Sequence, residues 1–97
     1  QMEGAMAMRL VIPMEAAAGK RDELIDTFRT LAPEVRQEAG CQSYELYQST
    51  ERPNPMVLLE LWESEEALAA HSELNRQRGL DLSQLRTGPT AAERYLT

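Results

Sequence analysis

The chain has 97 residues, of which 42% are apolar and 27% are charged, so it has the size and balance of one globular domain. Its formal net charge is -6 and its basic residues are scattered, which argues against a nucleic acid or an anionic membrane as a partner. The single cysteine, Cys41, excludes an intramolecular disulfide. We expect a cytoplasmic protein, because the sequence shows no secretory pattern and no apolar run of membrane-spanning length.

The first half of the chain predicts a strand followed by a helix. Residues 1–6 fit no periodic pattern, and we expect a disordered tail or a cloning remnant there. Residues 8–14 alternate between two faces, as a strand does. A helix is predicted to begin at residues 20–21 and to be capped by Gly40 in a left-handed conformation. Pro33 is expected to bend this helix or to loosen one of its hydrogen bonds. The apolar stripe of this helix steps by four, three and four residues: Leu24, Phe28, Leu31 and Val35.

The middle of the chain predicts a hairpin and a second helix. Residues 41–49 alternate as a strand, residues 50–55 have the proline and asparagine content of a loop, and residues 56–62 form an antiparallel partner strand. Ser64 is predicted to cap the helix that follows, with two glutamates in its first turn. This helix carries the sole histidine, His71.

The pattern after Asn75 is weaker. Gly79 predicts a break, three leucines between residues 80 and 85 indicate a further short helix, and residues 91–96 alternate as a last strand. The predicted order is therefore strand, helix, strand, strand, helix, strand. Such a chain folds as an α+β domain, with both helices on one side of a four-stranded antiparallel sheet in the ferredoxin-like arrangement.

Both faces of the strand at residues 56–62 are largely apolar. Its odd-numbered side chains point one way, while Met56, Leu58, Glu60 and Trp62 point the other way. Because the helices cover only one face, we expect the face with Glu60 and Trp62 to be open and to need a second subunit or a ligand as cover. The sequence thus predicts a homodimer through the open sheet face, and we place the functional site on that face.

Several kinds of site are disfavoured by residue content. The five glycines are far apart, so a glycine-rich phosphate loop for a nucleotide cofactor is not expected. One histidine and one cysteine cannot by themselves hold zinc, and we expect no metal. Cys41 and His71 could form a nucleophilic pair, although Cys41 equally fits a small buried apolar residue.

Acid–base chemistry is what remains, and each candidate has a structural alternative. His71 is a general base near neutral pH, or a helix-end histidine bonded to a carbonyl group. Glu60 is a carboxylate whose pKa is raised by burial, or one half of a salt bridge to Arg9 across a dimer interface. Trp62 is the wall of an aromatic pocket or an interface anchor. The further candidates are Glu45, Tyr44 and Tyr47.

Two stretches of this sequence resemble the antibiotic biosynthesis monooxygenase family: EAGCQSYELYQS at residues 38–49, and MVLLELWESEEALAAHSEL at residues 56–74. In that family a Gly-Cys-x-x-Tyr strand leads to a Glu-x-Trp-x-Ser strand end and a Leu-x-x-His helix. The resemblance implies a dimeric α+β barrel. It also implies oxidation of a quinol or an aromatic polyketide-like molecule by molecular oxygen, without a metal, flavin or other cofactor.

The resemblance also implies a set of site residues, in a pocket between the sheet and the helices of a dimer. The pocket falls on Glu60, Trp62 and His71, with His71 as the base and Tyr44 or Tyr47 as the proton donor. Glu60 counts as a third catalytic candidate. The substrate-binding candidates are Trp62, Tyr47, Leu58 and Arg9.

Three alternatives stay open within this resemblance. A haem-degrading relative is disfavoured, because the first strand lacks an asparagine and no second histidine is present. An isomerase of a phosphorylated autoinducer has an ending similar to LRTGPTAAERYL and would need cationic groups to hold a phosphate. Candidates for that role are Arg9, Arg76, Arg78 and Arg94. The third alternative is a non-catalytic dimer that binds a small molecule.

Overall fold

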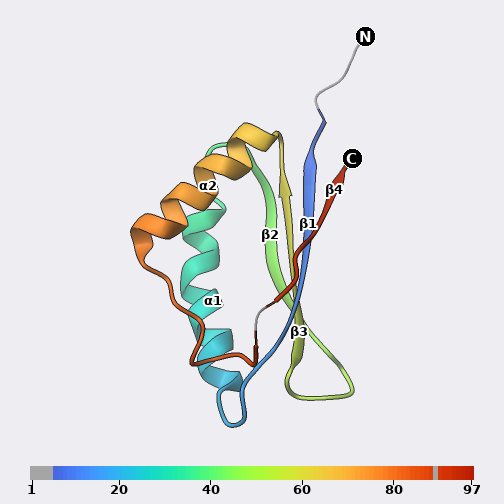
Figure 1. Cartoon of the computed structure of the whole chain (residues 1–97), viewed down its shortest axis with the longest axis vertical. Helices are drawn as coiled ribbons and strands as arrows, with labels where there is room; N and C mark the ends of the chain where they lie inside the picture. Colours follow the sequence, from blue (N-terminus) through green and yellow to red (C-terminus); the bar gives the residue numbers. More distant parts are fainter. Residues whose placement is uncertain (1–5, 89) are drawn as a thin grey trace.

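The computed structural model describes residues 6–88 and 90–97, and it confirms the predicted order of strands and helices (Figure 1). Apart from Met6, the tail predicted at residues 1–6 lies outside the described residues. The elements are β1 (Met8–Glu15), α1 (Arg21–Val35), β2 (Cys41–Gln48), β3 (Pro55–Trp62), α2 (Glu65–Arg78) and β4 (Glu93–Leu96).

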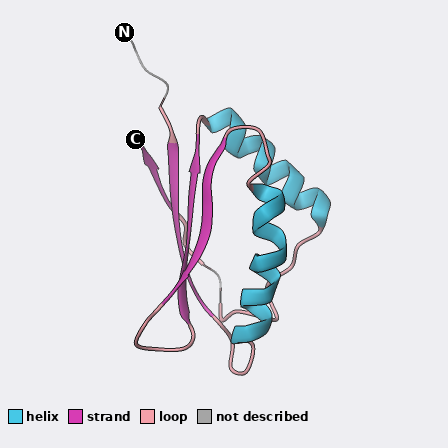
Figure 2. Ribbon diagram, turned by 180° about the vertical axis from the view of Figure 1, so that it is seen from behind, coloured by secondary structure: helices cyan, strands magenta, loops and turns pink. Residues whose placement is uncertain are grey.

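The four strands form one antiparallel sheet in the order β2-β3-β1-β4. The two central strands, β1 and β3, pair along their whole length, from Met8 opposite Trp62 to Glu15 opposite Pro55. Both helices lie on the same side of this sheet (Figure 2). The α+β class and the ferredoxin-like arrangement are therefore confirmed.

The core lies between the helices and one face of the sheet. The predicted stripe of α1 is buried there, together with Ile25 and Ala32 of the same helix. From the sheet, β1 contributes Met8, Leu10 and Met14, and β2 contributes Tyr44. The even-numbered side chains of β3 complete this face: Met56, Leu58, Glu60 and Trp62.

The predicted orientation of β3 is therefore wrong. Glu60 and Trp62 lie beneath the helices and are 4% and 0% exposed, whereas Val57, Leu59 and Leu61 form the face without helices. The physical reason is register. Trp62 pairs with Met8 and Glu60 pairs with Leu10, and directly paired residues share a face. A carboxylate on this face is tolerated because buried polar partners lie beside it, as described below.

The helix ends follow the predicted chemistry at three of four positions. α1 begins at Arg21 as expected, Ser64 Oγ accepts a hydrogen bond from the Ala67 amide at 3.1 Å, and Gly79 ends α2 with a left-handed φ of 67°. Gly40 is also left-handed, but it does not cap α1, because the helix already ends at Val35. Neither helix is long and apolar enough to cross a membrane.

The short helix predicted from the leucines after Gly79 is not formed. Residues 80–85 are irregular and end in a turn, although Leu82 and Leu85 are buried against the core. These two leucines occupy core positions without helical backbone. Their spacing in the sequence therefore arises from burial in the core and not from the period of a helix. The last strand is shorter than predicted, since β4 begins at Glu93 and not at residue 91.

Candidate functional site

His71 is the centre of a buried polar cluster on the helix side of the sheet. α2 presents His71 and Leu68 inward, and these are its two buried residues. The ring of His71 stacks on Trp62 of β3, with centroids 4.5 Å apart and planes 30° apart. The ring of Tyr44, from β2, meets it edge-on at 5.9 Å. The imidazole therefore contacts two aromatic side chains, and His71 is 4% exposed.

Both ring nitrogens of His71 have polar partners. Nδ1 lies 2.8 Å from Glu38 Oε1, and Nε2 lies 3.1 Å from Asn75 Nδ2. Nε2 is also 3.8 Å from Glu60 Oε1. One histidine thus joins the loop after α1, the helix α2 and the strand β3.

The partners of Asn75 determine which nitrogen of His71 carries the proton. Arg78 Nη1 donates to Asn75 Oδ1 at 2.8 Å, and a guanidinium has no acceptor, so the amide oxygen must face Arg78. The amide nitrogen of Asn75 therefore faces His71 and donates to Nε2. In the neutral ring Nδ1 then carries the proton and donates to Glu38, and the lone pair of Nε2 accepts the hydrogen bond from Asn75.

Glu38 is held by a second charge. Arg78 Nη2 lies 2.8 Å from Glu38 Oε2, an ion pair whose approach is close but not aligned as a hydrogen bond. The side chain of Glu38 is 8% exposed. A buried carboxylate that accepts the Nδ1 proton orients the imidazole and stabilises it when Nε2 is protonated, as the third member of a catalytic triad does.

Glu60 is the second buried carboxylate of the cluster. Trp62 Nε1 donates to Glu60 Oε1 at 2.9 Å, so the indole supplies the hydrogen bond that a buried carboxylate needs. Burial raises the pKa of Glu60 above its usual value, and Glu38 raises it further, while the Trp62 hydrogen bond and His71 act in the opposite direction. The cluster therefore contains one carboxyl group that takes up a proton more readily than an exposed glutamate.

Tyr44 stays protonated in this setting. Burial raises the pKa of its hydroxyl, and the charges of Glu60 and Glu38 raise it further. Tyr44 is therefore suited to donate a hydrogen bond and not to act as a base. Cys41 lies near the same end of the sheet, opposite Trp62, and burial likewise raises the pKa of its thiol.

The structure separates the predicted site residues into two groups. His71, Glu60, Trp62 and Tyr44 meet in the cluster, and Leu58 lies further along the same face of β3. Tyr47 and Arg9 lie on the opposite face of the sheet, since they pair with Val57 and Leu61. The side chain of Arg9 approaches the backbone oxygen of Glu60 at 3.5 Å and does not reach its carboxylate.

Two structural alternatives from the sequence can now be compared with the observed contacts. His71 is bonded to a carboxylate and an amide side chain, and not to a backbone carbonyl group. Glu60 is partnered by Trp62 within the same chain. Among residues 6–88 and 90–97, no group of three or more potential ligands is arranged to hold a metal ion.

Sequence reasoning missed Glu38 and Asn75, and it considered Arg78 only as a group that could hold a phosphate. A signal existed for two of them, because Asn75 and Arg78 follow His71 by four and seven positions and so share its face of α2. Glu38 lies in the irregular segment after α1, where no periodicity indicates a direction. Its role depends on a contact across thirty-three residues that local patterns do not report.

Comparisons with known proteins agree with this fold. A sequence model described as antibiotic biosynthesis monooxygenase matches residues 7–78. One relative is the Bacillus subtilis (strain 168) protein named "Putative monooxygenase YcnE", which is 32% identical over 60 residues. The match covers 62% of this chain and 63% of the relative, so the chain spans less than two thirds of the length of that relative.

Solved structures extend the similarity to nearly the whole chain. PA3566 from Pseudomonas aeruginosa superimposes with a TM-score of 0.83 at 24% identity, covering 99% of this chain and 98% of that one. A conserved protein from Methanosarcina mazei Go1 gives a TM-score of 0.79 at 27% identity, over 94% and 92% of the two chains.

Proposed function

The chain belongs to the antibiotic biosynthesis monooxygenase family, and from this premise we propose that it is a cofactor-independent monooxygenase acting on a quinol or another electron-rich aromatic molecule. The observation that carries the proposal is the contact between Glu38 and His71. The contact directs the Nδ1 proton of His71 to Glu38. Nε2, which accepts a hydrogen bond from Asn75, is then the nitrogen that can take up a proton, and it lies beside Trp62, Tyr44 and Glu60. Proton abstraction from an aromatic substrate requires such a group.

The proposed reaction needs only a base and molecular oxygen. His71 Nε2 takes a proton from an acidic ring CH₂ group, as in an anthrone, and the carbanion passes one electron to O₂. The two radicals couple through a new C–O bond, and His71 returns its proton to the distal oxygen. The hydroperoxide then loses water, so that one CH₂ group and one O₂ become one C=O group and one H₂O. No electron is left over.

The surrounding residues have defined parts in this reaction. Glu38 stabilises the imidazolium formed after proton abstraction, because it accepts the Nδ1 proton at 2.8 Å. Tyr44 holds its proton and serves as the hydrogen-bond donor to the reduced oxygen. Trp62 stacks on the His71 ring and so holds the direction in which Nε2 points.

Substrate access requires α2 to move. His71 is 4% exposed, so a substrate cannot reach its ring in the conformation described. Of the fourteen residues of α2, two are buried, so its opening exposes little apolar surface. The main cost of opening is the loss of the contacts of Glu38 with His71 and Arg78. We propose that α2 swings away from the sheet to admit the substrate and returns to exclude water.

We also propose that a second copy covers the sheet face without helices. Its centre is formed by the half-buried Val11, Val57, Leu59 and Leu61. Tyr47 of β2 and Tyr95 of β4 lie on either side of this strip, since they pair with Val57 and Arg9. They are 49% and 51% exposed. An apolar strip of this kind on an antiparallel sheet favours a face-to-face pair of identical chains. The pairing surface is thus opposite to the one expected from the sequence.

Oxygen uptake tests the proposed activity. With anthrone as substrate and no added metal, the protein should consume oxygen faster than buffer does. His71→Ala should reduce this excess rate about 100-fold or more, as expected for loss of a general base. Gln77→Ala is a matched control, since Gln77 is exposed on the same helix and contacts Glu73. Equal rates with and without protein over a panel of quinols and anthrones would contradict the proposal and favour a non-catalytic binding dimer.

A further inference from the structure

A groove runs between α2 and β4, on the other side of Leu68 from His71. Its volume is ≈ 510 Å³. The floor is formed by Leu10 and Leu68, both of which belong to the core. The wall from α2 carries the small residues Ala69 and Ser72 together with Glu65, Glu73 and Arg76.

The pairing of the strands relates this groove to the polar cluster. Tyr44 pairs with Glu60, Glu60 with Leu10, and Leu10 with Arg94, so these four residues form one row across the sheet. Directly paired residues share a face, so all four side chains are on the helix side. Neighbouring strands are about 5 Å apart, which places the Cα atom of Arg94 about 10 Å from that of Glu60, with Leu10 between them.

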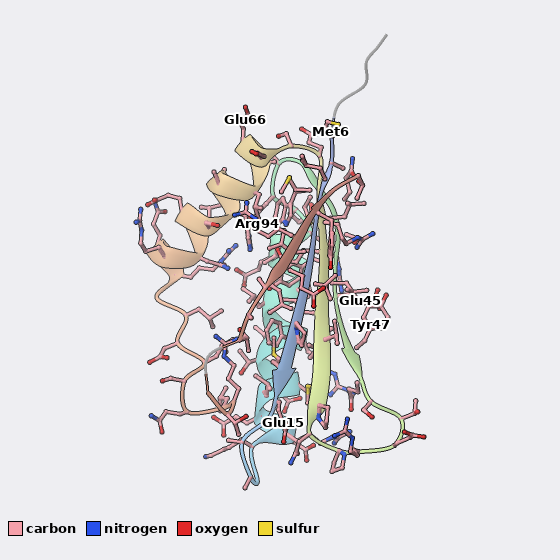
Figure 3. All side chains as sticks on the ribbon, turned by 45° about the vertical axis from the view of Figure 1, so that its right-hand side comes forward. Met6, Glu15, Glu45, Tyr47, Glu66 and Arg94 are labelled. Carbon is pink, nitrogen blue, oxygen red and sulfur yellow. The ribbon has the colours of Figure 1, made fainter. Side chains whose placement is uncertain are left out.

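Arg94 is one of two arginines that line this groove. Figure 3 shows its side chain between β4 and α2. The other arginine on the groove, Arg76, is already paired with Glu73 on α2. In the part of the chain that the structure describes, no ion pair involves Arg94. The remaining acidic group on the groove, Glu65, is the first residue of α2.

We propose that this groove binds the substrate of the proposed oxygenase as an aromatic acid, with the anionic group of the substrate on Arg94. A guanidinium above an apolar floor matches a flat aromatic body that ends in a carboxylate, because the floor takes the ring and the fork of Arg94 takes both oxygens. The row then sets the length of the ligand. Leu68 separates the groove from His71. When α2 opens as proposed above, a fused aromatic system anchored at Arg94 extends over Leu10 toward Glu60 and His71, where the reacting ring belongs. This inference rests on the proposed function for its substrate class, but the groove and its charge exist without turnover.

Binding of non-reacting probes tests the groove separately from catalysis. By titration calorimetry, 2-naphthoate should bind at least about tenfold more tightly than its neutral counterpart 2-naphthamide, since a charge-assisted hydrogen bond is worth more than a neutral one. Arg94→Gln should bring the ratio of the two dissociation constants close to one, and Arg94→Lys should give an intermediate ratio. Arg29→Gln is the matched control, because Arg29 lies on α1 and pairs with Asp26.

The possible outcomes separate the two proposals. Equal binding of acid and amide to the unmodified protein, absence of binding by both, or equal effects of Arg94→Gln and Arg29→Gln would overturn the anionic site. A preference for the acid that depends on Arg94 supports it, even if no quinol or anthrone is oxidised, in which case only the proposed activity fails. Oxygen uptake without a preference for the acid would support the proposed activity and overturn the anionic site.

Discussion

Glu38 and His71 are thirty-three residues apart in the chain, and Glu38 Oε1 lies 2.8 Å from His71 Nδ1. The contact connects the segment after α1 to the middle of α2 and gives the imidazole one fixed orientation. Arg78 holds both ends of this arrangement, since it pairs with Glu38 and donates to Asn75, the partner of Nε2. The tautomer of His71 is thus set by residues of two different segments.

Replacing Glu38 by glutamine should reduce oxygen uptake by about 10- to 100-fold. The amide oxygen of the new side chain still accepts the Nδ1 proton, but it no longer stabilises the imidazolium with a full charge, and hydrogen bonds to charged groups are worth about 1.5–3 kcal/mol. The free energy of unfolding in urea should also fall, by about 1–3 kcal/mol, because Arg78 loses its carboxylate partner.

Glu34→Gln is the matched control for that experiment. Glu34 also approaches Arg78, at 3.9 Å, but its side chain is 63% exposed, so its charge is screened by solvent. It should change stability by no more than about 0.5 kcal/mol and leave the oxygenase rate unaltered. If Glu34→Gln and Glu38→Gln reduced the rate equally, a specific role for Glu38 would be ruled out.

The titration of Glu60 should lower the free energy of unfolding as pH rises. Burial raises the pKa of this carboxyl above its ordinary value of 4.5, so between 4.5 and the raised pKa the folded state binds more protons than the unfolded state. Stability is then lost as pH rises through this window. Glu60→Gln removes the titration and keeps an oxygen for the Trp62 hydrogen bond.

The measurement is urea unfolding of both proteins from about pH 4.5 to about pH 8. The stability of Glu60→Gln relative to the unmodified protein should increase with pH across the window and then level off. A difference that stays constant, or that falls as pH rises, would show that Glu60 does not titrate as a buried carboxyl group.

Gly40 should be the least replaceable glycine of the described chain. Its φ is +81°, and a Cβ atom there would lie 2.5 Å from Ala67 Cβ on α2. Gly40→Ala should therefore combine the left-handed strain of about 1–2 kcal/mol with a steric clash. Gly19 has a similar φ of +74° and nothing within 4 Å, so Gly19→Ala should show the backbone cost alone.

A second change tests the source of the clash. Adding Ala67→Gly to Gly40→Ala should bring the free energy of unfolding closer to that of Gly19→Ala, after correction for the effect of Ala67→Gly alone. If the double variant shows no coupling between the two positions, the close approach of Gly40 to α2 is not the cause of the destabilisation.

The proposed pairing of two chains predicts that a charge on the open sheet face keeps them apart. Leu59→Glu should sediment at the mass of one chain, 11.0 kDa, under conditions in which the unmodified protein sediments at twice that mass. Leu74→Glu is the control, because Leu74 is 39% exposed on α2, outside this face. A single-chain mass for the unmodified protein at micromolar concentration would contradict the pairing.

The periodicity of the sequence was sufficient to predict the six helices and strands. It was insufficient to predict which face of β3 the helices cover. The alternation in β1 and the stripe of α1 are local properties, so the order of elements, the cap at Ser64 and the ferredoxin-like class could be predicted. The short helix predicted from the leucines after Gly79 was wrong, because Leu82 and Leu85 are buried without helical backbone.

The sequence by itself determined the element order and the residue types available for acid–base chemistry, since both depend on near neighbours in the chain. Which face of β3 lies under the helices was decided by its register with β1, a pairing between distant segments. The same is true of the cluster: His71 could be singled out as the sole histidine, but Glu38 joined it only when the segment after α1 packed against α2. Because an apolar side chain fits either face of a strand with two apolar faces, only tertiary packing could decide where Glu60 and Trp62 lie.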